Sequence, residues 1–332
     1  MKIIRYSLNP LTPPTATDSD PDVRHGDLAE LPPEARLLPP CAPSKIVCVG
    51  RNYAEHAKEL GNEVPQEPLI FLKPPSSLIA SGDSIVYPKL SQRVDFEGEL
   101  GVVIGKRARN VGSAEANGYI LGYTCVNDVT ARDLQKKDGQ WTRGKGFDTF
   151  CAVGPSIVRR EDADFNGFRV QTFVNGEKKQ DAPVTEMLFN VNDIIAYVSA
   201  FMTLEPGDLI ATGTPPGVGP LQPGSTVQIV IEGVGALQNS VIAAAGYTCS
   251  KVYGPPLPFK SSSRCRRRSR SWRWSSISCC ESGGIPKTKK RSGGSKSIKK
   301  GAWETPPLPK FTRIRFSTSI PCAAYCTPLL RT

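Results

Sequence analysis

The stretch Asp95-Phe-Glu-Gly-Glu-Leu-Gly-Val-Val-Ile104 runs from an acidic segment into an apolar segment that is typical of a buried β-strand. Because side chains alternate along a strand, Glu97 and Glu99 are expected on one face and Gly98 on the other. Two carboxylates on one face repel each other unless a cation or a bound proton offsets their charges. The stretch therefore predicts either an oxygen-rich site for Mg²⁺, Mn²⁺ or Ca²⁺, completed by a third acid, or a solvated polar face at a strand end.

Short apolar runs bounded by turn residues, a pattern typical of β-strands, dominate the chain on both sides of this stretch. They cover residues 1–8, 45–49, 69–72, 84–87, 99–104, 119–126, 168–174, 208–211 and 227–231. Asn175-Gly176 lies between two apolar alternations and predicts a type I′ hairpin. Helical patterns are fewer and cover residues 51–60, 113–117, 131–137 and 192–203. The sequence therefore predicts a strand-dominated α+β domain without the regular strand–helix alternation of a doubly wound sheet.

Charge divides the 332-residue chain into two parts. Residues 247–332 hold 19 Lys and Arg and two acids, and so carry +17, whereas residues 1–246 carry −6 within a total of +11. The basic segment is rich in Ser and Gly and has no apolar periodicity, so it is predicted to be a disordered tail. The total charge is therefore no argument that the folded part binds nucleic acid. The expected organisation is an N-terminal strand and irregular arm (1–43), a folded domain (44–246) and a basic tail (247–332).

The cysteines and the N-terminal residues indicate the compartment. Four of the ten cysteines lie in residues 1–246, without the paired spacing of a disulfide framework or zinc site, which favours a reducing compartment. No apolar run reaches the roughly 18 residues of a membrane span, and the first residues do not resemble a secretory signal. Several acids in residues 15–36 argue against an organellar transit peptide. The sequence predicts a cytoplasmic protein without a membrane segment, with an organellar location left open.

A third acid, Asp128, lies just after the strand pattern at residues 119–126. Asp128 follows that run and precedes a helical pattern, so it is either a partner for the two glutamates or the N-cap of a helix. Arg132 and Gln135 are three residues apart in the helical pattern and so share a helix face. They are expected either to present a guanidinium and an amide to a substrate carboxylate or to be solvated surface residues.

Three other motifs carry groups suited to catalysis. His56 and Glu59 stand at positions i and i+3 of a short helical pattern, where the carboxylate can orient the imidazole as a general base for water. Lys145 lies among small residues before an apolar stretch and can approach a ligand anion. Thr214 lies in a Gly/Pro loop at residues 211–219, which predicts either a structural turn or a carboxylate-binding loop. The ordinary interpretation of His56 and Glu59 is a pair on a helix surface, and that of Lys145 is a solvated lysine.

Six segments that contain these residues follow one another along the chain. They are Gly50-Arg-Asn-Tyr-Ala-Glu-His56, Phe71-Leu-Lys-Pro74, Glu97-Gly-Glu99-Leu-Gly, Asn127-Asp128-Val-Thr-Ala-Arg-Asp133-Leu-Gln135, Lys145-Gly-Phe and Thr212-Gly-Thr-Pro-Pro-Gly-Val-Gly219. In this order they resemble the fumarylacetoacetate hydrolase family, particularly its branch of acylpyruvate hydrolases and oxaloacetate decarboxylases. The resemblance covers roughly residues 44–240. It implies a mixed β-sheet roll with few helices, commonly assembled as a homodimer, and makes residues 44–246 the catalytic domain.

The resemblance implies a metal centre and a base. Glu97, Glu99 and Asp128 match the family's three carboxylate ligands for Mg²⁺ or Mn²⁺. His56 and Glu59 match its water-activating catalytic pair, which the family carries on a mobile lid helix.

The resemblance also implies a keto-acid substrate. Lys145, as a catalytic residue, and Arg132 and Gln135, as substrate-binding residues, match positions around the keto-acid end, and Thr214 lies in the loop near the substrate carboxylate. The implied reaction is hydrolysis of a C–C bond in acylpyruvates or related 1,3-diketo acids, through water attack and a metal-stabilised pyruvate enolate. Oxaloacetate decarboxylation and 2-hydroxyhepta-2,4-diene-1,7-dioate isomerisation use related enolates and stay open. Nucleic-acid binding, a different class of function, rests on the basic tail alone, which is equally well interpreted as an extension without selected function.

Overall fold

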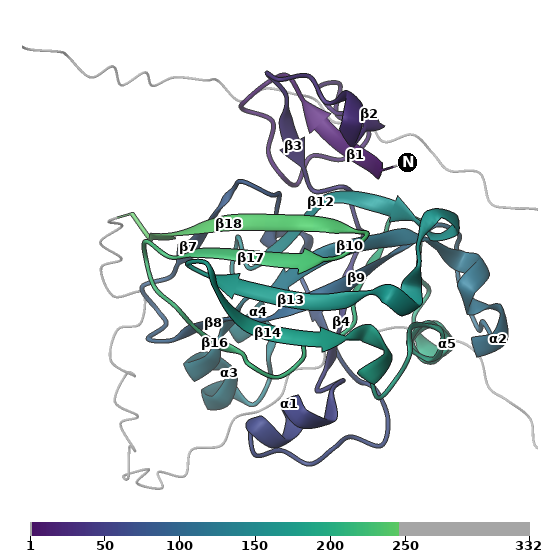
Figure 1. The fold of residues 1–332 in the computed structure, drawn as a ribbon, viewed down its shortest axis with the longest axis vertical. Helices are drawn as coiled ribbons and strands as arrows, with labels where there is room; N and C mark the ends of the chain where they lie inside the picture. Colours follow the sequence, from purple (N-terminus) through teal and green to yellow (C-terminus); the bar gives the residue numbers. More distant parts are fainter. Residues whose placement is uncertain (1, 246–332) are drawn as a thin grey trace, which may run out of the picture. The chain divides into compact units, whose positions relative to one another are not determined.

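The computed structural model describes residues 2–245, so the predicted basic tail at residues 247–332 lies outside the described residues. Strands in three sheets dominate this part of the chain (Figure 1). The largest sheet has ten strands; eight follow the order β2-β1-β12-β10-β9-β15-β4-β5, while β3 pairs with β1 and β6 with β12. These strands are β1 (Lys2–Ser7), β2 (Arg24–Asp27), β3 (Arg36–Leu38), β4 (Ile46–Gly50), β5 (Leu69–Lys73), β6 (Leu78–Ile79), β9 (Gly98–Ile104), β10 (Ile120–Asp128), β12 (Cys151–Arg159) and β15 (Leu209–Ala211).

Two smaller sheets complete the framework. Five strands follow the order β14-β13-β17-β18-β7 and are β7 (Ser84–Tyr87), β13 (Arg169–Val174), β14 (Glu177–Pro183), β17 (Thr226–Ile231) and β18 (Gly235–Ala243). The three-stranded sheet follows the order β11-β8-β16 and consists of β8 (Val94–Phe96), β11 (Thr130–Ala131) and β16 (Gly219–Leu221). Most pairs are antiparallel, but β15–β4, β18–β7 and β12–β6 are parallel. This mixed, strand-dominated α+β arrangement confirms the predicted fold class.

The helices are short and lie between strands. The α-helices are α1 (Ala54–Glu59), α2 (Ser113–Ala116), α3 (Arg132–Asp138), α4 (Thr142–Lys145) and α5 (Val191–Phe201). The 3₁₀-helices are η1 (Leu28–Glu30), η2 (Pro75–Ser77), η3 (Asn117–Tyr119), η4 (Arg160–Asp162), η5 (Phe165–Gly167) and η6 (Val184–Glu186). Helix α5 buries Ile194, Ile195 and Val198 on one face, as its sequence pattern predicts. Among the described residues, no helix is long and apolar enough to cross a membrane.

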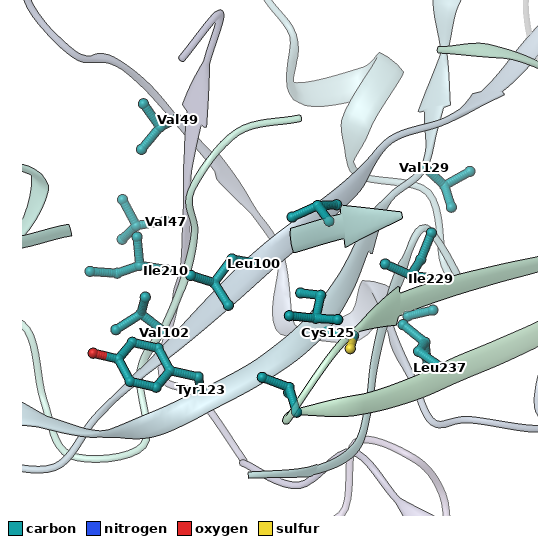
Figure 2. Close-up of a cluster of buried hydrophobic side chains, with 14 of the residues drawn as sticks. Val47, Val49, Leu100, Val102, Tyr123, Cys125, Val129, Ile210, Ile229 and Leu237 are labelled. Carbon is teal, nitrogen blue, oxygen red and sulfur yellow. The ribbon is translucent and has the colours of Figure 1, made fainter. Parts of the chain in front are cut away.

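The main core lies between the large sheet and the five-stranded sheet (Figure 2). Apolar side chains from both sheets meet there, and the labelled ones are Val47, Val49, Leu100, Val102, Tyr123, Cys125, Val129, Ile210, Ile229 and Leu237. Burying a Val, Leu or Ile side chain contributes about 1.5–3 kcal/mol. This core therefore fixes β9 and β10 firmly, and these two strands carry the acids singled out in the sequence.

The N-terminal arm is more ordered than its sequence suggests. Strands β2 and β3 both pair with β1, and β1 pairs with β12 of the large sheet. The guanidinium of Arg5, which is 1% exposed, holds the arm together. It donates to the carbonyls of Ala16 at 2.6 Å and Pro39 at 2.8 Å, and to Asp18 Oδ1 at 2.7 Å. Most of residues 8–43 are turns, bends and irregular segments; the two short strands β2 and β3 were not predicted, because side-chain-to-backbone hydrogen bonds order this segment without an apolar period.

Candidate functional site

Three carboxylates meet at the start of β9 and the end of β10. Glu97 lies between β8 and β9, Glu99 lies on β9, and Asp128 is the last residue of β10. The pairing of Asn127 with Gly98 brings the end of β10 beside Glu97, whose carbonyl accepts the Asp128 N–H at 2.9 Å. One oxygen from each carboxylate lies within 4.8 Å of the others, and all three residues are buried. The predicted alternation is therefore correct, and burial excludes a solvated strand end.

Gly98 stands between the two glutamates and faces the five-stranded sheet. A Cβ atom at this position would lie 2.1 Å from Thr172 Oγ1, 3.0 Å from Ile229 Cδ1 and 3.2 Å from Gln180 Oε1. The first distance is well inside van der Waals contact, so only glycine lets β9 approach β13 and β17 this closely. Close packing behind Gly98 thus holds both glutamates toward the opposite side, where Asp128 lies.

Buried cations contact two of the three acids. Lys145 Nζ donates to Glu97 Oε2 at 2.7 Å and also to Asp128, while Lys73 Nζ donates to Asp128 Oδ1 at 2.6 Å. Burial alone would raise the pKa of Glu97, but the charges of Lys145 and Arg132 outweigh it and hold that pKa well below its usual range. Burial alone would lower the pKa of Lys145, but Asp128 and Glu97 outweigh it and raise that pKa. These groups therefore stay charged near neutral pH.

Glu99 differs from its two neighbours because it forms no ion pair with any described residue. One of its oxygens accepts the Gly213 N–H at 2.8 Å. Burial raises the pKa of Glu99 well above its usual range, and the charges of Asp128 and Glu97 raise it further. A divalent cation would supply the missing positive charge, and three carboxylates form the all-oxygen donor set that Mg²⁺ and Mn²⁺ prefer. The residues present therefore fit such a metal.

Arg132 and Gln135 occupy the predicted shared face of α3, and that face is buried. Arg132 donates from Nε to Asp95 Oδ2 at 2.9 Å, from Nη1 to Gln135 Oε1 at 2.7 Å, and from Nη2 to Glu97. The guanidinium is thus shared among protein partners, and it holds Glu97 in place. Asp128 is not the N-cap of this helix, because α3 begins at Arg132 and has no side-chain capping bond.

His56 and Glu59 form the pair that the sequence predicts on α1. His56 Nδ1 lies 3.4 Å from Glu59 Oε2, and the Gly217 N–H donates to the same carboxylate oxygen at 3.1 Å. The ring of His56 is buried, whereas Glu59 is exposed. Burial lowers the pKa of His56, although the charges of Glu97 and Glu59 oppose this shift. A neutral imidazole at neutral pH is the form that can accept a proton.

The loop at residues 211–219 packs against β9. The Thr214 hydroxyl donates to the Gly98 carbonyl at 2.8 Å and accepts from Gln180 Nε2 at 2.7 Å. The same amide group of Gln180 donates to the Pro215 carbonyl and accepts the Gly98 N–H through its oxygen at 3.0 Å. The Thr214 hydroxyl is therefore occupied by protein partners, although the residue lines the cavity described next.

A cavity of about 320 Å³ brings these groups together. It is lined by every site residue predicted from the sequence except Glu59, which reaches it through His56; the lining residues are His56, Glu97, Glu99, Asp128, Arg132, Gln135, Lys145 and Thr214.

Sequence reasoning assigned no role to five residues that build or line this site. Lys73, Asp95 and Gln180 hold the acids or their neighbours, and Arg51 and Trp141 line the cavity. A lysine that ends an apolar strand pattern, as Lys73 does, is a signal that could have revealed a buried ion pair.

A mixed sheet that carries a buried three-carboxylate centre beside a His–Glu pair defines a class of enzyme. Residues 45–242 match the family model described as fumarylacetoacetate (FAA) hydrolase C-terminal. The chain therefore belongs to the fumarylacetoacetate hydrolase family, and its fold is the mixed-sheet roll that the resemblance implied.

Three relatives show how the family varies. The chain is 44% identical over 216 residues to a human mitochondrial oxaloacetate tautomerase. The aligned residues cover 62% of this chain and 69% of the relative. It superposes with a TM-score of 0.63 on a 5-carboxymethyl-2-hydroxymuconate delta-isomerase from Mycobacterium smegmatis, at 40% identity, covering 74% of this chain and 100% of the other. Fumarylpyruvate hydrolase from Pseudomonas aeruginosa, solved with Mn²⁺ and pyruvate, gives a TM-score of 0.59 at 30% identity, covering 63% and 92%. The relatives are thus a tautomerase, an isomerase and a hydrolase.

Proposed function

We propose that this protein is a divalent-metal-dependent enzyme that hydrolyses a C–C bond in acylpyruvates or related 1,3-diketo acids. The observation that carries the proposal is the His56–Glu59 pair, because His56 lines the same cavity as the buried acids Glu97, Glu99 and Asp128. A base beside an acidic metal site is the combination that water attack on a carbonyl requires. The name of the hydrolase solved with Mn²⁺ and pyruvate supports both the metal and the product.

The residues of this chain divide the work of the proposed reaction. Glu97, Glu99 and Asp128 would hold Mg²⁺ or Mn²⁺, which would supply Lewis-acid chemistry toward the keto-acid end of the substrate. His56, oriented by Glu59, takes a proton from the water that attacks the distal carbonyl carbon.

The C–C bond then breaks, which gives a carboxylic acid and the enolate of pyruvate, and the enolate takes up a proton to give pyruvate. Lys145, whose Nζ contacts Glu97 and Asp128, would stabilise the developing enolate with its positive charge. Arg132, Gln135 and Thr214 line the cavity and would bind the keto-acid end of the substrate, and Arg132 would also hold Glu97 through its contact with that carboxylate.

Keto–enol tautomerisation of oxaloacetate is the second candidate. It is favoured by the 44% identity with the human oxaloacetate tautomerase. Tautomerisation needs a base that moves a proton at the carbon beside the keto group, and it needs no attacking water. Decarboxylation of oxaloacetate and isomerisation of an unsaturated hydroxy-diacid pass through related enolates, so they belong to the same test.

The purified 332-residue chain should be assayed with acetylpyruvate and with oxaloacetate in Mg²⁺ or Mn²⁺, with and without a chelator. Hydrolysis is followed by acetate and pyruvate release, tautomerisation by the enol absorbance of oxaloacetate, and decarboxylation by CO₂ release. We expect acetylpyruvate cleavage that the chelator and His56→Asn both abolish. Tautomerisation without cleavage would replace the first proposal by the second, and no turnover of either substrate would overturn both.

The assembly and the basic tail remain separate proposals. We propose a homodimer, as the resemblance implies, and expect sedimentation velocity to give twice the mass of the chain. Nucleic-acid binding through residues 247–332 would appear as a salt-dependent interaction that is lost when those residues are removed. Absence of binding at physiological salt would eliminate that alternative.

A further inference from the structure

Arg51 is a cavity residue with a backbone conformation that non-glycine residues rarely adopt. It follows directly on β4 and has a φ of 58°. Such conformations cost free energy and persist only where the surroundings impose them, which is common at ligand-binding positions.

The neighbouring Asn52 imposes this turn. Its side chain donates to the carbonyls of Phe189 at 3.0 Å and Thr212 at 2.7 Å and accepts the Phe189 N–H at 2.8 Å, while its own carbonyl accepts the Leu188 N–H. The hydrogen bonds of the buried Asn52 amide therefore fix the backbone at this turn, and Arg51 keeps its positive φ instead of joining helix α1, which begins at Ala54.

An indole ring stands beside the guanidinium of Arg51. The guanidinium carbon lies 5.9 Å from the centre of the Trp141 ring. Trp141 itself is fixed, because its ring packs so closely on Gly50 that a Cβ there would lie 2.8 Å from the indole. Stacking on an aromatic face restricts a guanidinium to few orientations and leaves its N–H groups free to bind an anion.

Aromatic rings connect Arg51 with the acidic centre. Trp141 packs edge-on against Phe71 with ring centroids 5.1 Å apart, and Lys145 Nζ lies 4.8 Å from the centre of the Phe71 ring. Lys145 in turn contacts Glu97. The wall of the cavity therefore runs from the carboxylates, past two aromatic rings, to Arg51.

Arg51 also differs from Arg132, Lys73 and Lys145 in its partners. Lys73, Lys145 and Arg132 each form ion pairs with buried acids. Within residues 2–245, the side chain of Arg51 forms no ion pair and no hydrogen bond. Its guanidinium makes a cation–π contact with Trp141. Arg51 lines the cavity that holds the three carboxylates and also lines two neighbouring surface cavities, so we place it at the opening of the first cavity.

We propose that Arg51 binds a second carboxylate at the end of the substrate remote from the keto acid. The site would then select 2-keto diacids over 2-keto acids that have an uncharged end. This inference rests on the proposed keto-acid substrate, and it assigns to Arg51 the choice of substrate rather than a step of the reaction. The planar guanidinium suits this role because it can donate two parallel hydrogen bonds to one carboxylate.

Calorimetric binding to the full chain in Mn²⁺ tests the inference without turnover. The probes are 2-oxoglutarate and 2-oxoadipate, each paired with an analogue in which an isopropyl group replaces the distal carboxylate. We expect at least one diacid to bind about 10–100-fold more tightly than its analogue, which is the usual effect of a charged hydrogen bond. Arg51→Gln should reduce this preference to less than about 3-fold, and Arg51→Lys should leave an intermediate preference, since it keeps the charge but not the planar fork.

Lys136→Met is the matched control, because Lys136 is another cation that lines the cavity but is exposed and has no aromatic ring against it. This variant should keep the full preference for the diacid. Equal binding of diacid and analogue by the wild type, absence of binding by either, or a preference that survives Arg51→Gln would overturn the inference. A preference that depends on Arg51, in a protein that turns over neither acetylpyruvate nor oxaloacetate, would instead overturn the proposed function and leave the inference standing.

Discussion

Gly98→Ala tests whether the close approach of the two sheets positions the acidic centre. The new methyl group would meet the Thr172 hydroxyl at 2.1 Å and two further side-chain atoms at 3.0 and 3.2 Å. Thr172 is short, β-branched and fully buried in β13, so it cannot swing aside as a long side chain would. Either β9 or β13 must therefore move, and Glu97 and Glu99 move with β9.

The expected cost follows from this geometry. Adding a methyl group to a well-packed core costs about 1–3 kcal/mol. We expect about 3 kcal/mol for Gly98→Ala, because the nearest contact belongs to a stiff side chain. For a domain of this size that loss corresponds to a fall in Tm of roughly 6–12 °C.

Thermal and urea unfolding of the full chain measure this loss. Gly112→Ala is the control, because Gly112 has an ordinary φ of −73° and nothing lies within 4 Å of the position of a new Cβ. It should change the free energy of unfolding by less than about 0.5 kcal/mol. Adding Thr172→Ala to Gly98→Ala should recover much of the lost stability, since it removes the clashing hydroxyl. A wild-type Tm for Gly98→Ala, or no recovery in the double variant, would refute the reasoning.

Three further predictions concern the charged groups. Glu99→Gln should raise the Tm of the metal-free protein at neutral pH, because the raised pKa of Glu99 makes folding take up a proton, a cost that a neutral amide does not have. It should also abolish stabilisation by Mn²⁺ in a thermal-shift assay; a wild-type response to Mn²⁺ would contradict this. Lys73→Met leaves Asp128 with Lys145 as its remaining cation and should cost about 1.5–3 kcal/mol in urea unfolding, and a loss below about 1 kcal/mol would show that the Lys73–Asp128 pair is dispensable. Burial lowers the pKa of His56 from 6.5, so the acidic limb of the kcat/KM profile should lie below pH 6.5. The unfolded chain binds the proton of His56 more readily than the folded chain does. The stability that this group contributes is therefore complete above pH 6.5 and is lost as the pH falls from there to the folded pKa. An acidic limb of the kcat/KM profile above pH 6.5 would contradict the lowered pKa.

Local periodicity predicted the features that depend on neighbouring residues. Alternation alone placed Glu97 and Glu99 on one side and Gly98 on the other. The hairpin at Asn175-Gly176 is also confirmed, because both residues have the positive φ, 51° and 82°, that a type I′ turn requires. Strand β14 was missed because its outer residues, beginning at Glu177, are polar and exposed at the edge of a sheet, where no apolar alternation is needed.

Contacts between distant segments were beyond the reach of the sequence pattern. The ion pair of Lys73 with Asp128 joins residues 55 positions apart, and that of Arg132 with Asp95 joins residues 37 positions apart. The place of Lys73 at the end of an apolar run can suggest a buried ion pair, but nothing in the local pattern identifies its partner, and most lysines and arginines are solvated. Helix α1 begins later than predicted, at Ala54, because the conformation of Arg51 and the extended Tyr53 delay it.

The pairing of β1 with β12 has a consequence for the solubility of the chain. Lys2 and Ile3 pair with Val158 and Ile157, so the first strand covers backbone N–H and C=O groups on the side of β12 that faces away from β10. Unpaired strand edges recruit strands of other molecules and so promote aggregation. A chain shortened to begin near residue 45 would keep Glu97, Glu99 and Asp128 and yet expose this edge. The N-terminal segment thus covers a strand edge that would otherwise be open to strands of other molecules.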